Sequence, residues 1–198
     1  MNKTWAEIKG SYRYGLFISI FFFIFSFIQT PEYEKSDLVI KSVTLFETPK
    51  FKRVGRKGKS VELKFRGYPT IYKIKGIDYK YLIYKKFKKE IKKGDRIKVG
   101  IKDEIALSIV KDGFDFMRFE QAQYHKKKNK LFVRYLSIAI FVLCIFPLLF
   151  KKRPTYKFKG KSHKIEFNVI FFIGLILTLI WLFFKIGFNF VSGAEFID

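Results

Sequence analysis

Three long runs of apolar residues divide the chain into membrane-like and polar stretches. The runs cover residues 15–28, 135–150 and 167–184. A helix needs roughly 20 apolar residues to cross about 30 Å of hydrocarbon, and flanking side chains such as Arg13 and Arg134 can reach the head groups where a run is short. The pattern therefore predicts three transmembrane helices. No small-x-small cleavage site follows the first run, so we expect a retained anchor rather than a signal peptide.

Each run places small or polar residues on one face. On a helical wheel the members of each set fall within roughly 40° of one another, because residues recur every 100°. The predicted helix-packing residues are Gly15, Ser19 and Ser26 in the first run, Ser137 and Cys144 in the second, and Gly174, Thr178 and Lys185 in the third. Such faces let membrane helices approach closely. We interpret them as packing within one chain, with an oligomeric bundle or a pore as the alternative.

The charge of Lys185 allows two interpretations. An ionisable side chain inside a membrane is a functional candidate by default. Lys185 lies near the end of its run, however, one turn after Trp181, where a lysine can extend to the head groups. We therefore expect it to lie at the membrane boundary.

Between the first two runs the apolar period changes from that of a helix to that of strands. Alternation over 38–46, 61–65, 71–75, 96–101 and 106–110 predicts strands. A loop is expected over 48–60, and Phe114 and Phe116 can add a short further strand. Ile83, Phe87 and Ile91 recur every four residues and Gly94 follows, which predicts one helix. Residues 119–130 are expected to form a polar helix that continues into the second run.

The order of these elements is three strands, one helix and two strands. Over residues 38–110 this order resembles the OB-fold, a five-stranded barrel whose members bind oligonucleotides, oligosaccharides or proteins. The expected fold is therefore a membrane protein with three transmembrane α-helices and a small OB-like β-barrel (β-β-β-α-β-β) between helices 1 and 2. An SH3-like barrel or an α+β sandwich is the alternative.

The expected organisation follows from these runs and boundaries. The segments are an interfacial stretch with the first span (1–30), a basic β-rich domain (31–130), the second span (131–150), a basic loop (151–166), the third span (167–191) and a short acidic tail (192–198).

Charge adds a preference for anionic partners. The chain holds 40 Lys and Arg against 17 Asp and Glu, a net charge of +23. Lipid head groups, nucleic acid or an acidic protein would complement it. The most distinctive cluster lies in the predicted 48–60 loop, and we take it as the candidate site for an anionic partner. Its members are Lys50, Lys52, Arg53, Arg56, Lys57 and Lys59. The alternative is a solvated loop, or one that rests on anionic lipid.

A second basic patch, formed by lysines between residues 85 and 93, is interpreted as the solvent side of the predicted helix.

The distribution of basic residues predicts an orientation. The short 151–164 connection is rich in Lys and Arg, whereas the tail after Val191 has none, and short basic loops stay in the cytoplasm. We therefore expect a cytoplasmic N-terminus, with the domain and the C-terminus outside. Abundant Lys, Ile, Phe and Tyr are typical of an AT-rich bacterial genome, so the expected location is a bacterial inner membrane.

Enzyme chemistry finds little support in the sequence. His125 and His163 are far apart in Lys-rich contexts and no Cys/His cluster exists, so neither a metal site nor a cofactor is expected. The carboxylate pair Asp103 and Glu104 and the turn at Asp112 have no catalytic context.

The expected function is a non-enzymatic binding module, as an accessory subunit of an envelope complex or as an immunity protein. Its expected partners are membrane lipids with anionic head groups and a protein or a second copy, rather than nucleic acid. The alternative is a membrane effector whose domain faces the cytoplasm, senses an anionic nucleotide and permeabilises the bilayer through its helices. A nucleotide ligand is expected only in that orientation.

Overall fold

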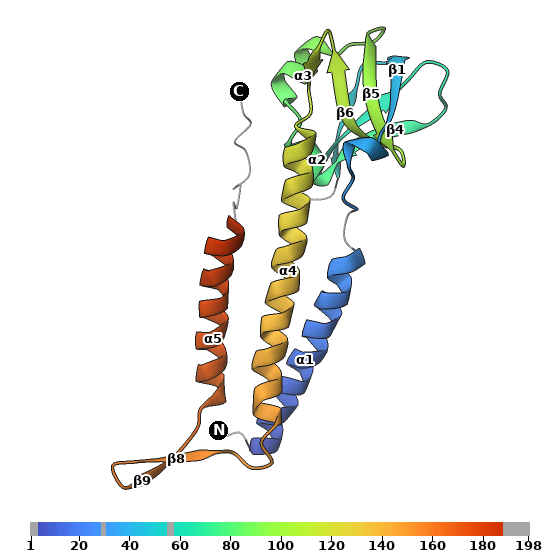
Figure 1. Ribbon diagram of the computed structural model, residues 1–198. Coiled ribbons are helices and arrows are strands. Elements are labelled where there is room, and N and C mark those ends of the chain that lie inside the picture. The colour runs from blue at the N-terminus through green and yellow to red at the C-terminus, as the bar shows by residue number, and fades with distance from the viewer. Residues whose placement is uncertain (1–3, 29–30, 55–57, 188–198) are drawn as a thin grey trace. The chain divides into compact units, whose positions relative to one another are not determined.

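The computed structural model describes residues 4–28, 31–54 and 58–187, and the chain divides into two compact units (Figure 1). One unit consists of residues 4–28 and 128–187, and the other of residues 31–127. Helix α4 contributes its first residues to the second unit and the rest to the first.

The helical unit is built from three long helices. They are α1 (Trp5–Ile28), α4 (Phe119–Leu148) and α5 (Phe167–Leu182), the last continued by the π-helical segment η2 (Phe183–Gly187). Each is long and apolar enough to cross a membrane, which makes the chain compatible with a multi-pass membrane protein. The helices are apolar around most of their circumference, as lipid-facing helices are. The predicted acidic tail and the end of the third span lie outside the described residues.

A small aromatic cluster joins α1, the end of α4 and the start of α5. The hydroxyl of Tyr12 donates to the side-chain oxygen of Asn168 at 3.0 Å. The ring of Trp5 lies 5.5 Å from that of Phe167. These contacts link the first and last helices of the unit.

The basic connection 151–166 was predicted as a loop, and the structure shows that it contains a hairpin. Strands β8 (Thr155–Phe158) and β9 (Lys161–Lys164) pair antiparallel. Lys159 and Gly160 both have positive φ, 49° and 76°, as a two-residue hairpin turn requires. All eight strand residues are exposed. Because neither strand has a buried face, the hydrophobic pattern of the sequence does not predict them.

The second unit is a mixed sheet with short helices. Its strands are β1 (Val39–Thr44), β2 (Lys50–Val54), β3 (Gly58–Lys64), β4 (Ile71–Lys75), β5 (Arg96–Lys102), β6 (Ile105–Lys111) and β7 (Phe114–Asp115). Its helices are the 3₁₀ turn η1 (Lys35–Asp37), α2 (Gly76–Lys80) and α3 (Tyr84–Glu90). The predicted single helix over 83–91 therefore becomes α3, preceded by the unpredicted α2.

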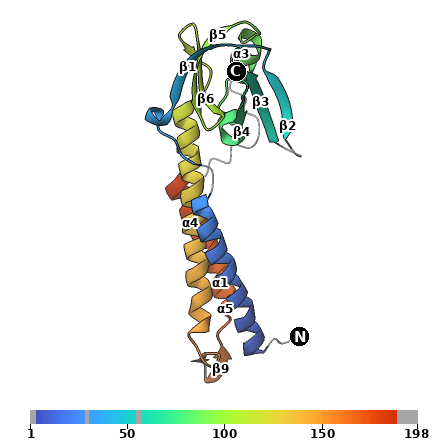
Figure 2. The ribbon, with the colours of Figure 1, turned by 90° about the vertical axis from the view of Figure 1, so that its right-hand side faces the viewer.

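The expected closed barrel is wrong. The strand order is β1-β5-β6-β4-β3-β2 with β7 beside β6, so β1 and β2 are the two ends of the sheet and do not pair with each other (Figure 2). Just after β1, Leu45 forms an isolated bridge with Phe65, and the N–H of Phe46 donates to the carbonyl of Lys64 at the end of β3 at 2.9 Å. The chain bends after this point into β2, so the first strand does not continue a ladder around the sheet.

Strand β2 corrects the predicted 48–60 loop. The side chain of Phe51 packs inward, and its ring lies 5.1 Å from that of Tyr84 and 6.2 Å from that of Phe87. Lys50, Lys52 and Arg53 surround it in the sequence, so the hydrophobic pattern does not show the alternation of a strand. Packing against α3 stabilises the strand, and this packing partner is more than thirty residues away in the chain.

The core of the domain is one apolar cluster beneath the sheet. It contains the predicted inward positions of β5, Ile97, Val99 and Ile101, which are 2%, 0% and 6% exposed. Phe87 and Ile91 are buried in the same cluster on one side of α3, as the four-residue spacing predicts. The turns after β5 and β6 have positive φ at Asp103, Glu104 and Asp112, so these carboxylates are turn residues.

Candidate functional site

The most strongly charged feature that the register creates is one face of strands β2, β3 and β4. Residues directly opposite each other in a ladder point to the same side of the sheet. The register places Glu62 between Lys50 and Lys73, and it places Ser60 between Lys52 and Lys75. Lys64 joins this side because strand residues two apart share a face. We call the five lysines Lys50, Lys52, Lys64, Lys73 and Lys75 the lysine face.

Two carboxylates interrupt the lysine face. Lys52 Nζ lies 2.7 Å from Glu62, and this hydrogen bond lowers the pKa of the Glu62 carboxyl. Glu47 accepts from Lys50 at 2.8 Å and from Lys64 at 3.3 Å, and the hydrogen bond from Lys50 is the main reason its pKa is lowered. Both glutamates therefore stay ionised and hold three of the lysines.

The β4 side of the lysine face is less neutralised. Lys73 and Lys75 are exposed, and within the described residues neither has a carboxylate at ion-pair distance. Between Lys52 and Lys75 the side chain of Ser60 is only 6% exposed. The arrangement can attract an anion through ammonium groups that are not already paired inside the chain.

The opposite side of the same hairpin brings two more cations together. Arg53 and Lys59 are directly opposite each other in the β2–β3 ladder, and both are exposed. Like charges at directly opposite positions destabilise a pair of strands.

The structure thus distributes the predicted anionic site over two strands. Lys50, Lys52 and Arg53 lie on β2 and Lys59 lies on β3, whereas Arg56 and Lys57 lie outside the described residues. The predicted set does not include Lys64, Lys73 and Lys75, which the register places on the lysine face. Their signal was present in the alternation of the predicted strands 61–65 and 71–75, where lysines occupy the positions opposite the apolar ones.

The lysines of α3 and the turn after it behave differently. Lys86 Nζ lies 3.3 Å from the centroid of the Phe114 ring, and Lys92 donates to the carbonyl of Lys88 at 2.9 Å. Lys89 and Lys93 are exposed. The α3 lysines therefore provide a second basic surface, on a helix rather than on the lysine face, that serves as a comparison for binding.

A buried ion pair fixes the start of α4 to the domain. Lys126 Nζ lies 2.8 Å from each carboxylate oxygen of Asp78 on α2, and the two side chains are 2% and 5% exposed. Burial raises the pKa of the Asp78 carboxyl, and the hydrogen bond from Lys126 opposes that shift. Nearby, the ring nitrogen Nδ1 of His125 lies 3.1 Å from the hydroxyl of Tyr81. This polar contact surface holds α2 against α4.

The membrane helices bring several predicted packing residues together. A Cβ atom on Gly15 would lie 2.5 Å from the Sγ of Cys144, and one on Gly174 would lie 2.6 Å from the Cδ2 of Leu143. Glycine at these two positions therefore permits the close approach of α1 and α5 to α4. Thr178 instead donates to the carbonyl of Gly174 in its own helix at 2.8 Å.

Lys185 lies in η2 with its side chain exposed, at the end of the third span.

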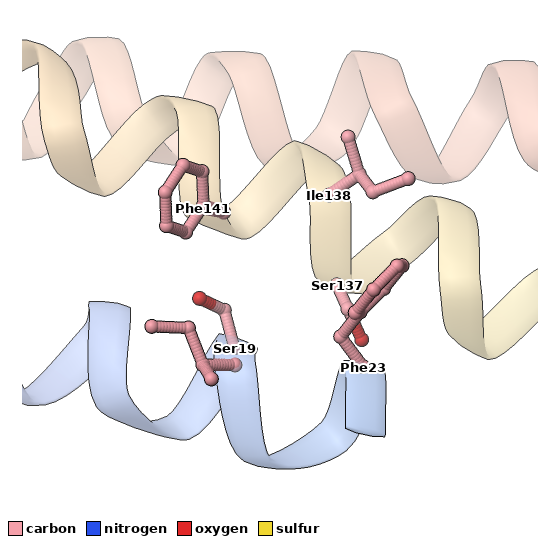
Figure 3. Close-up of a pocket in the computed structure, with 6 residues that line it drawn as sticks. Ser19, Phe23, Ser137, Ile138 and Phe141 are labelled. Atoms are coloured by element: carbon pink, nitrogen blue, oxygen red, sulfur yellow. The ribbon is translucent and has the colours of Figure 1, made fainter. Parts of the chain in front are cut away.

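Ser19 on α1 and Ser137 on α4 both line a cavity between the two helices (Figure 3). Both are almost fully buried, and each hydroxyl donates to a carbonyl of its own helix, that of Leu16 or Val133. Ser26, fully buried about two turns further along α1, accepts from Nε of Arg134 at 3.3 Å. The seam between α1 and α4 thus runs from Gly15 to Ser26.

No cluster of His, Cys, Asp and Glu that could hold a metal ion occurs in residues 4–28, 31–54 and 58–187. His163 stacks on Tyr156 in the exposed β8–β9 hairpin. The described chemistry is therefore that of cation-rich surfaces and helix packing. Comparison of the chain with protein-family models, with curated proteins and with solved structures found no match.

Proposed function

We propose that the chain is a non-enzymatic, membrane-anchored binding module whose lysine face and β2–β3 hairpin bind an acidic segment of another protein. The observation that carries this proposal is the placement of Lys73 and Lys75 on the lysine face. Lys73 and Lys75 lie beside the hairpin cations without an ion-pair partner among the described residues.

The partner we favour is a protein rather than nucleic acid. Stacking platforms for bases require aromatic side chains exposed on the binding face. On β2, β3 and β4 the aromatic residues Phe51 and Tyr72 point into the core, while the lysine face carries ammonium groups and two glutamates. Isolated carboxylates on an extended or helical segment complement such a surface.

The proposed binding role is also supported by a resemblance of the domain to the OB-fold. We regard the domain as a partly open variant of the OB arrangement, in which a helix-containing segment separates the third and fourth long strands. β1 and β2, joined through Leu45, would together represent the first strand, bent between the two ends of the sheet. This likeness supports a binding role only by analogy, since fold does not carry function.

The orientation that we propose places the domain outside the cytoplasm and the β8–β9 connection inside. The basic side chains of residues 151–164 support it, because short basic loops remain in the cytoplasm. In a bacterial inner membrane this makes the chain an accessory subunit of an envelope complex or an immunity protein. The alternative, a nucleotide-sensing effector that permeabilises the bilayer, requires the opposite orientation.

Binding can be tested with a fluorescent poly-glutamate peptide and the detergent-solubilised full chain. Changing Lys73→Ser and Lys75→Ser together should weaken binding roughly five- to tenfold at low salt and flatten its salt dependence, because two unpaired surface charges are lost. The matched control, Lys89→Ser with Lys93→Ser, removes the same charge from the α3 side and should leave binding nearly unchanged. An equal loss of binding affinity in both variants would mean that only the net charge of the domain matters, and it would refute the proposal.

Orientation can be tested by labelling introduced cysteines on intact cells with an impermeant thiol reagent, in a Cys144→Ala background. Ser60 is a poor probe because it is buried, so Ser36 reports on the domain and Ser162 on the β8–β9 hairpin. The proposal expects labelling at position 36 and protection at position 162. The reverse pattern would overturn the orientation and favour the effector.

A further inference from the structure

The seam between α1 and α4 contains a cavity of about 230 Å³. The cavity lies between two points where the helices touch, Gly15 against Cys144 at one end and Ser26 against Arg134 at the other. Between these contacts the facing residues include Ser19 and Ser137, whose side chains are too short to fill the space. Ile20, Phe23, Ile138 and Phe141 complete the wall (Figure 3).

The wall of the cavity is hydrocarbon. Both serine hydroxyls donate to carbonyls of their own helices, at 2.7 Å each, and the surface that the cavity exposes is apolar. Cavities lined in this way stay dry, and an apolar cavity of about 150 Å³ is already large enough to bind benzene. The fitting occupant is therefore an apolar chain rather than water or an ion.

A cation stands at one end of the cavity. Arg134 lies one turn before Ser137 on α4, at the start of the apolar run. Its Nε donates to Ser26, and its guanidinium carbon lies 4.1 Å from the centroid of the Phe27 ring. These contacts leave the terminal amino groups of the guanidinium available, and no carboxylate of the described residues lies at ion-pair distance from them. A planar guanidinium with two parallel N–H groups matches a phosphate.

The level of Arg134 along the helices is that of a membrane boundary. The neighbouring Tyr135 makes an edge contact with Trp181 of α5, with ring centroids 5.9 Å apart. Tyrosine and tryptophan gather where hydrocarbon meets head groups. A phosphate at Arg134 and an acyl chain running toward Phe141 would therefore each lie at its natural depth.

We propose that the α1–α4 seam is a binding site for one anionic phospholipid, with its phosphate at Arg134 and part of an acyl chain in the cavity. This site is separate from the lysine face and does not depend on it. The bound lipid fills a space that the small serines leave, so it acts as a wedge that sets the spacing of α1 and α4.

The test uses the full chain reconstituted in vesicles of equal phosphatidylglycerol and phosphatidylcholine, extracted in mild detergent and analysed by native mass spectrometry. The expected result is one retained phosphatidylglycerol per chain. Arg134→Gln should lower the preference for phosphatidylglycerol roughly tenfold, as expected for loss of a charged hydrogen-bond donor. Lys127→Gln removes an exposed cation from the same helix and should change nothing.

Filling the cavity tests the acyl chain separately from the head group. Ser137→Phe should abolish retention of both lipids, whereas Phe141→Ala enlarges the cavity and should preserve it. Ile24→Phe, which places the same side chain on an exposed face of α1, is the control. Retention of lipid by Ser137→Phe at the level of the unchanged chain would overturn the proposal.

Photocrosslinking of a lipid to the unchanged chain tests the site without relying on a variant that fails to fold. Phosphatidylglycerol carrying a photoreactive diazirine in its acyl chain should crosslink mainly to Ile20 and Phe141. Crosslinks spread evenly over α1, α4 and α5 would mean ordinary bilayer contact. Crosslinks between two chains through cysteines introduced at position 19 would mean that a second copy fills the cavity. Either outcome refutes the lipid site.

Discussion

The buried pair of Lys126 and Asp78 makes a quantitative prediction about the domain. The ammonium nitrogen lies 2.8 Å from both carboxylate oxygens, and the two side chains are 2% and 5% exposed. Removing one member of such a pair leaves an uncompensated buried charge, which costs about 3–5 kcal/mol. A domain of this size has a total stability of about 5–15 kcal/mol. Lys126→Met or Asp78→Asn alone should therefore remove a large part of it.

Hydrogen exchange of the β5 and β6 amides in the full chain measures this loss without interference from the membrane helices. A loss of about 3–5 kcal/mol corresponds to exchange roughly 10² to 10³ times faster or more. The double variant Asp78→Leu with Lys126→Met buries no charge, so it should recover most of the stability. Exchange in either single variant within a factor of about five of the unchanged chain would refute the reasoning, since a pair worth so little is solvated.

The dependence on pH distinguishes the two single variants. Burial raises the pKa of Asp78 above its ordinary value of 3.8, and Lys126 opposes this shift. In Lys126→Met the opposition is gone, so the folded state binds a proton more tightly than the unfolded state. Its stability should be greatest below about 3.8 and should fall as pH rises through the raised pKa. Asp78→Asn has no carboxyl at this position and should lack that dependence.

Three further changes test other parts of the structure. Gly15→Ala should destabilise the α1–α4 contact by about 1–3 kcal/mol because the added Cβ meets the Sγ of Cys144. Adding Cys144→Ala to the same chain should restore the stability, as measured by thermal unfolding in detergent. Failure of this rescue would contradict the contact. Glu62→Gln removes a carboxylate from the lysine face and should tighten poly-glutamate binding roughly two- to fivefold at low salt, an effect that peptide titration should show vanishing at high salt. Val99→Asp places an unpaired charge where the side chain is 0% exposed and should destabilise the domain by several kcal/mol, which amide exchange in β5 would reveal; native-like protection would refute its place in the core.

Several elements follow from the local pattern of the sequence. The helices α1, α4 and α5 arise from long apolar runs, which only a membrane or a large core can accommodate. Strands β3 and β4 follow from the alternation of apolar and polar residues, because one side of each faces the core. The burial of Phe87 and Ile91 likewise follows from their spacing on one side of α3.

Other elements depended on contacts that are distant in the chain. In strand β2 the side chain of Phe51 packs against α3, which is distant in the chain, and the basic residues around it give the segment the pattern of a loop. The sheet was expected to close because the order of its elements resembles that of the OB-fold. Its openness depends on where the bend after Leu45 separates β1 from β2.

The candidate sites divide in the same way. The sequence by itself determined that the domain is basic and that small residues line one face of each membrane helix, since composition and helical period are local properties. The tertiary structure decided that Lys73 and Lys75 lie beside the hairpin lysines, because only the ladder register aligns β4 with β3. The tertiary structure also decided that Lys126 is buried, although it lies in a run of lysines whose pattern is typical of a solvated surface. Asp78, 48 residues earlier in the chain, buries and pairs it, because α2 and α4 pack together only in the folded domain.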